Sequence, residues 1–109
     1  MKLIGSRIEQ QLREELLESS AGLRERVNVR LTEALESAGI LPSNALILNW
    51  IPDQAEDFYV VLISIRELLH IEIPRDGGVV QMRRETLVEY ERRVSKTLRL
   101  KIAVAKSLL

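Results

Sequence analysis

Residues that can do chemistry lie mainly in the middle third of this chain, where His70 alternates with Glu72. Alternating residues of a β-strand point to the same face, so these two side chains would stand together on a sheet. A histidine beside a carboxylate can act as a general base or contribute to a metal site. The sequence has one histidine and no cysteine to supply further ligands. We therefore interpret the pair as solvent-facing or as a cross-strand polar contact.

Carboxylates form a second candidate site at Asp53, Glu56 and Asp57, between two apolar runs. Such a cluster can bind a divalent cation or do acid–base work. Its spacing matches no calcium-loop pattern and lacks the glycine of one, so a solvated turn is expected. Together with Glu67, these residues are also candidates for an acidic patch that binds a basic protein.

Basic residues near the C-terminus form a third candidate. Residues 79–109 carry eight basic and three acidic side chains and residues 40–78 carry two basic and six acidic, although the whole chain is neutral. A C-terminal helix would place Arg92, Lys96 and Arg99 on one face. Such a face can neutralise phosphates. No exposed aromatic pair or glycine-rich loop accompanies it, so a solvated helix face is the first interpretation.

The composition favours no class of enzyme. We find no spacing typical of a nucleophile with its base, a phosphate-binding loop or a metal site. We therefore expect no enzyme activity, no cofactor and no metal. The absence of cysteine suits a reducing compartment, and no apolar run is long enough to span a bilayer. The expected location is the cytoplasm, away from membranes.

The first third of the chain is expected to be helical, because apolar residues recur there at helical spacing. One stripe covers residues 8–16 and a second covers residues 23–38. Between them, a serine of residues 19–22 would cap a second helix, or the two stripes belong to one kinked helix. Gly39 is placed to end the second helix in a left-handed conformation. The second stripe consists of Leu23, Val27, Leu31 and Leu35.

The middle of the chain is expected to form a β-sheet. Residues 44–51 are a short apolar run between prolines, and residues 58–65 are rich in β-forming side chains. Residues 68–73 alternate between apolar and polar. No glycine or proline separates the last two runs, so residues 58–73 are either one long bent strand or two strands. Residues 79–82 are a candidate for a further edge strand.

A long C-terminal helix is expected from about residue 87 onward. Its main apolar stripe consists of Leu87, Val94, Leu98, Ile102, Ala105 and Leu109. A second apolar line, Leu100, Val104 and Leu108, lies on another face. Either a helix from the first third covers this line or another chain does, in which case it is an oligomer face.

These elements predict one α+β domain over residues 1–109. Two N-terminal helices and a long C-terminal helix would pack on one face of a small, mainly antiparallel sheet. Residues 58–65 are apolar on both faces, and a strand of that kind lies between two layers. The helices must then divide between the faces, or a second copy must close the open face.

With no catalytic group assembled, the sequence favours a non-enzymatic protein-binding module. It would be a small bacterial immunity protein that neutralises a toxin, or a homodimeric adaptor. The partner of the first kind would be a basic toxin or nuclease, and we expect a homo-oligomer. One alternative is a nucleic-acid-associated protein that uses the basic C-terminal helix. The other is a small metal-dependent enzyme built on Asp57, Glu67, His70 and Glu72.

Overall fold

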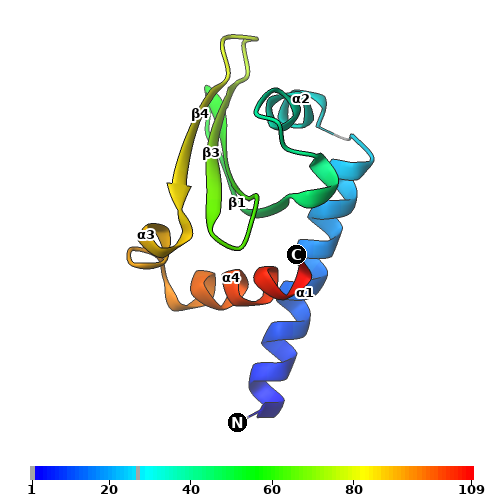
Figure 1. Cartoon of the computed structure of the whole chain (residues 1–109), viewed down its shortest axis with the longest axis vertical. Coiled ribbons are helices and arrows are strands. Elements are labelled where there is room, and N and C mark those ends of the chain that lie inside the picture. The colour runs from blue at the N-terminus through cyan, green and yellow to red at the C-terminus, as the bar shows by residue number, and fades with distance from the viewer. Residues whose placement is uncertain (1, 27) are drawn as a thin grey trace.

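The computed structural model describes residues 2–26 and 28–109, with side chains from residue 7 onward (Figure 1). Within these residues the chain forms an α+β fold, as predicted, with a four-stranded antiparallel sheet in the order β1-β2-β3-β4. The helices are α1 (Lys2–Arg24), α2 (Val29–Ser37), α3 (Leu87–Glu91) and α4 (Lys96–Leu108), with a short 3₁₀ turn at Pro42–Asn44. The strands are β1 (Leu46–Pro52), β2 (Glu56–Leu62), β3 (Glu67–Pro74) and β4 (Gln81–Thr86).

The first third forms two helices, but the break lies later than residues 19–22. Helix α1 continues through those residues to Arg24, which brings Leu23 into the core at 2% exposure. The cap of α2 is Asn28, not a serine, and its Oδ1 accepts a hydrogen bond from the Leu31 N–H at 3.1 Å. Gly39 follows α2 with a φ of 78°, which confirms the predicted left-handed ending. Val27, part of the predicted second stripe, lies outside the described residues.

Residues 58–73 form two strands joined by a tight turn. The Ser64 hydroxyl accepts hydrogen bonds from the N–H groups of Arg66 and Glu67, both at 3.1 Å. A serine side chain therefore reverses the chain where glycine or proline would be usual. Because the turn is made by serine, the lack of glycine and proline did not reveal whether residues 58–73 form one strand or two.

The predicted long C-terminal helix is wrong, because the chain bends at residues 92–95. Helix α3 is short, and Ser95 begins α4 by accepting a hydrogen bond from the Leu98 N–H at 3.2 Å. The bend lets α3 bury Leu87 and Tyr90 beside the sheet while α4 runs back toward α1. Strand β4 overlaps the predicted residues 79–82 only in part, because it begins at Gln81 and continues to Thr86.

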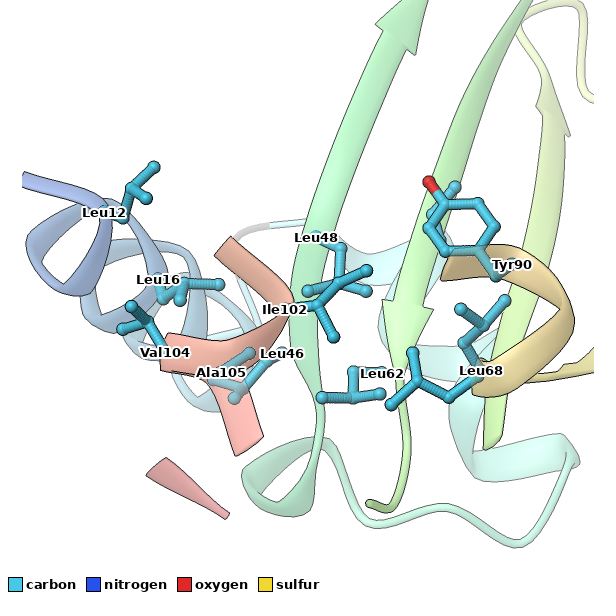
Figure 2. Close-up of a cluster of buried hydrophobic side chains, with 12 residues drawn as sticks. Leu12, Leu16, Leu46, Leu48, Leu62, Leu68, Tyr90, Ile102, Val104 and Ala105 are labelled. Carbon is cyan, nitrogen blue, oxygen red and sulfur yellow. The ribbon is translucent and has the colours of Figure 1, made fainter. Parts of the chain in front are cut away.

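The helices divide between the two faces of the sheet, because alternate residues of its strands belong to two separate clusters. This corrects the prediction that all three pack on one face and agrees with the alternative that they divide. One face of the sheet is covered in part by α3 and α4, and we call it the α4 face. There Leu62 and Leu68 pack with Leu16 and Ile102 (Figure 2). The other face, the α2 face, buries a second cluster that includes Val61, Leu69 and Ile71 from the sheet and Leu31 and Leu35 from α2. Near Leu62 and Leu68, helices of the same chain thus bury both faces of the sheet. No helix among the described residues is long and apolar enough to cross a membrane.

Two adjacent leucines of β3 test whether the apolar clusters on the two faces contribute similarly to the free energy of unfolding. Leu68 is 0% exposed on the α4 face and Leu69 is 2% exposed on the α2 face. We expect Leu68→Ala and Leu69→Ala each to lower the free energy of unfolding by about 2–5 kcal/mol in urea denaturation. Leu41→Ala is the control, since Leu41 is 64% exposed and its loss should cost less than about 0.5 kcal/mol. A large loss from only one of the β3 variants would contradict the two-sided core.

Candidate functional site

The candidate site is the half of the α4 face that none of the described helices covers. Helices α3 and α4 bury the end of the sheet near Leu62 and Leu68, whereas the opposite end, where β1 finishes and β2 begins, stays open. A groove of about 390 Å³ lies over this open half. We name it the sheet groove, and its lining includes Ile51, Phe58, Val60, His70, Glu72 and Arg83.

The floor of the sheet groove is apolar and its far side is polar. Ile51 and Phe58 are cross-strand partners on β1 and β2, and Ile51 is 52% exposed. Val60 continues the floor toward the core. His70 and Glu72 line the groove from β3, and Arg83 is the β4 partner of His70. An apolar strip beside charged side chains is suited to binding a surface that is itself part apolar and part polar.

His70 belongs to a polar cluster at the inner end of the sheet groove. Its Nε2 lies 2.7 Å from Oε1 of Glu85, and Arg93 donates hydrogen bonds from both terminal nitrogens to the same carboxylate. The guanidinium of Arg93 also lies over the ring of Tyr90, 5.3 Å from its centroid. The cluster joins β3, β4 and the region of α3. The sequence paired His70 with Glu72, whereas the polar contact of His70 in the structure is with Glu85 on the neighbouring strand.

Glu85 is held in its charged form by this cluster. The hydrogen bond from Arg93, opposed by desolvation and aided by His70, lowers the pKa of Glu85 to about 2. Its side chain is only 11% exposed. A histidine oriented by a carboxylate resembles part of a catalytic arrangement, but Glu85 is already neutralised by Arg93. Among the described residues, no group of three or more His, Asp and Glu side chains could hold a metal ion.

The predicted acidic residues are spread over the structure. Asp57 accepts hydrogen bonds from Arg75 at 2.8 Å and from the indole of Trp50 at 3.2 Å, and the bond from Arg75 is the main cause that lowers its pKa. Asp53 caps its own turn by accepting from the Gln54 N–H at 2.7 Å. Glu56 is the first residue of β2, close to both. These three residues lie in or beside the predicted turn, but the charge of Asp57 is paired with Arg75.

Glu67 lies at the opposite end of the sheet from that turn. Asp57 pairs with Ile73, six positions along β3 from Glu67, which corresponds to about 20 Å of strand. Glu67 is instead 3.6 Å from Arg84. Alternation along the strands also places Asp57 and Glu67 on the α2 face and His70 on the α4 face. Neither the four-residue acidic patch nor the four-residue enzyme site is brought together.

The predicted basic face is interrupted by the bend between α3 and α4. Arg92 caps the end of α3 and lies 3.6 Å from Glu89, whereas Lys96 begins α4. Arg99 donates to the carbonyl oxygen of Glu91 at 3.5 Å. The three side chains therefore do not share one continuous helix, which the predicted phosphate-binding face requires.

The predicted oligomer face is partly covered by α1. Val104 is 7% exposed and belongs to the same cluster as Leu12 and Leu16 of α1. Leu100 and Leu108 are partly buried against this cluster. The structure thus favours the alternative that a helix from the first third covers this line. A role of these residues in oligomer formation stays a prediction.

Several residues of the site were missed by sequence reasoning. Ile51 and Phe58 flank the β1–β2 turn at equal distances, so hairpin pairing across that turn would have placed them opposite each other. No sequence pattern indicated that Glu85 and Arg93 would meet, because Arg93 was expected within one long helix and Glu85 just before it. Only the bend after α3 brings Arg93 back to the sheet.

Comparison with known proteins identifies no relative: the chain matches no protein-family model, no curated protein and no solved structure. The site must therefore be interpreted from its own geometry.

The ion pair of Glu85 predicts a specific dependence of stability on pH. A folded-state pKa of about 2 lies below the ordinary value of 4.5, so the pair stabilises the fold above pH 4.5. This stability is lost as the pH falls toward 2. Glu85→Gln should lower the free energy of unfolding at pH 7 by about 1–3 kcal/mol, a range reduced for the partial exposure of Arg93. Urea denaturation between pH 7 and pH 2.5 measures the difference.

Glu89→Gln is the control for this experiment. Glu89 is a surface carboxylate, 62% exposed and 3.6 Å from Arg92, so its replacement should change stability by less than about 0.5 kcal/mol. The wild-type and Glu85→Gln curves should converge as the pH approaches 2. A constant gap between them at every pH would show that Glu85 stabilises the fold through packing and not through its charge.

Proposed function

We propose that this protein is a non-enzymatic protein-binding module whose partner docks on the sheet groove. The observation that carries the proposal is the half-open α4 face, where Ile51 is 52% exposed beside Phe58 and the charged side chains of β3 and β4. An exposed apolar strip with a polar border is typical of a protein–protein contact.

The shape of the groove supports a protein partner over a small molecule. Small-molecule sites enclose most of the ligand surface. Here the floor is a sheet surface with one exposed edge at β4, so a ligand would be covered mainly from one side. A partner that contributes its own apolar surface would bury Ile51 and Phe58 from the other side.

Both finer roles expected from the sequence belong to this class. A toxin-neutralising protein and an adaptor each need a stable scaffold with one specific surface. The apolar groove supports such a role more directly than the acidic residues do, because Asp57 and Glu67 are paired with Arg75 and Arg84. We therefore propose that apolar contact supplies the affinity, and that the charged side chains beside the groove set specificity.

The test is capture of the partner from the native cell, identification by mass spectrometry and binding measurement with the purified pair. Ile51→Ser and Phe58→Ser should each weaken binding by about tenfold or more, because central apolar residues dominate such interfaces. Leu41→Ser is the matched control, since Leu41 is 64% exposed and lies outside the groove. Circular dichroism would confirm that each variant is folded. Equal affinities for all four proteins would contradict docking on the groove.

A further inference from the structure

Strand β4 is an open edge of the sheet (Figure 1), and its residues Gln81, Met82 and Arg83 line the sheet groove. Five of its six residues are exposed and the sixth, Glu85, is half-buried. The other edge strand, β1, is different: α1 and α4 pack against it, its register is interrupted between Ile47 and Asn49, and it ends in Pro52. Coverage, irregular pairing and proline are common ways of blocking a sheet edge. Strand β4 has none of these three.

The hydrogen bonds at the ends of the sheet show which backbone groups of β4 point outward. The Leu87 N–H donates to the Arg66 carbonyl at 2.8 Å, which makes this pair a hydrogen-bonded pair of the antiparallel ladder. Such pairs alternate along the strands. In the register of β3 and β4, the backbone groups of Gln81, Arg83 and Glu85 therefore point toward β3. Those of Met82, Arg84 and Thr86 point away from the sheet.

The side chains of β4 favour an acidic partner strand. Arg83 and Arg84 are consecutive, so they stand on opposite faces of the strand. Arg83 has no ion pair among the described residues, and Arg84 has only the exposed contact with Glu67 at 3.6 Å. The neighbouring carboxylate of Glu85 is neutralised by Arg93. The edge thus presents two arginines that two consecutive carboxylates of an added strand would pair with.

A second copy of this chain fits the edge less well. Outward-pointing residues must face each other when two β4 edges pair about a two-fold axis. A pairing centred on Arg84 places it opposite its own copy. A pairing centred on Arg83 places Arg83 opposite its own copy, and a pairing centred on Glu85 does the same with Glu85. Like charges directly opposite destabilise a strand pair, so each of these three registers contains a repulsive contact, although the one centred on Arg84 also places Arg83 opposite Glu85. A register centred on Met82 has no like charges opposite each other. It places Arg83 opposite Gln81 and Arg84 opposite Val80, so neither arginine meets a carboxylate.

We propose that β4 accepts an extended segment of the partner protein as a fifth strand, and that this segment carries two consecutive acidic residues opposite Arg83 and Arg84. The inference rests on the proposed function, since the added strand lies beside the sheet groove. In the added strand, the residue next to the acidic pair faces Met82 of β4, which is 40% exposed. An apolar side chain suits that position. Strand addition supplies backbone hydrogen bonds, and the side chains supply the specificity.

The experiment uses the full chain and two pools of synthetic decapeptides. One pool carries Glu-Glu between variable Val, Ile, Thr and Tyr residues, and the other carries Lys-Lys at the same place. Fluorescence anisotropy at low salt should show binding of the Glu-Glu pool, with the Lys-Lys pool about tenfold weaker or more, because two attractive pairs become repulsive. The double variant Arg83→Glu/Arg84→Glu should reverse this preference. Both positions are exposed, so the fold should tolerate it.

Hydrogen exchange followed by nuclear magnetic resonance reports the mode of binding. In the free chain the amides of Arg83 and Glu85 should be protected and those of Met82, Arg84 and Thr86 should exchange quickly. The peptide should protect the second set. Arg84→Pro removes one outward N–H and should abolish binding, whereas Arg84→Ala should only weaken it.

Three results would overturn the inference. One is no preference for the Glu-Glu pool, including no binding of either pool. Another is binding that leaves Met82, Arg84 and Thr86 unprotected. The third is protection of these amides in the free chain that increases with concentration, which would identify a second copy as the occupant. None of these results bears on the Ile51→Ser and Phe58→Ser measurements, so failure of the strand-addition inference is distinguishable from failure of the proposed function.

Discussion

Burial of the two central strands on both faces is the constraint on which the rest of the structure depends. Val61 and Leu62 of β2 are both 0% exposed although they point to opposite sides of the sheet. One layer of helices cannot cover both. The chain therefore places α2 on one face and α3 with α4 on the other, while α1 contributes to both clusters. This division leaves part of each face open, since Ile51 on the α4 face is 52% exposed and Trp50, the cross-strand partner of Tyr59 on the α2 face, is 55% exposed.

Polar side chains hold the divided helices in place. Asn28, which caps α2, also donates to the Tyr59 hydroxyl of β2 at 2.8 Å. Arg30 of α2 donates to backbone carbonyl oxygens of Pro74 and Gly78 and so fixes the β3–β4 turn. On the other face, Glu85 and Arg93 perform the same task for α3. Because these contacts lie at the borders of the apolar clusters, they orient the layers without interrupting the cores.

The sheet groove follows directly from this arrangement. Helix α4 is directed toward α1, where Val104 packs with Leu12 and Leu16, and this direction takes it away from Ile51 and Phe58. The open half of the α4 face lies beside the edge strand β4, which is the last strand of the sheet and lines the groove. A rigid sheet with a preformed apolar surface loses little conformational entropy on binding, which supports a role as a binding scaffold.

Much of the fold was determined by local sequence. Helical spacing in the first third and β-forming runs in the middle predicted an α+β domain, and the doubly apolar strand indicated a second layer but not whether helices of the same chain supply it. Gly39 predicted the end of α2 because a left-handed residue is needed there. These signals are readable because each depends on residues close together in the chain.

Only the tertiary structure decided how the elements divide and where the site lies. The turn at Ser64 and the bend at Ser95 depend on side-chain hydrogen bonds that serine makes in some contexts and not in others. The separation of Glu67 from Asp57, and the meeting of Glu85 with Arg93 and His70, depend on strand register and on the return of the chain after α3. Register and layer assignment are set by the summed burial of distant residues, which no short stretch of sequence contains.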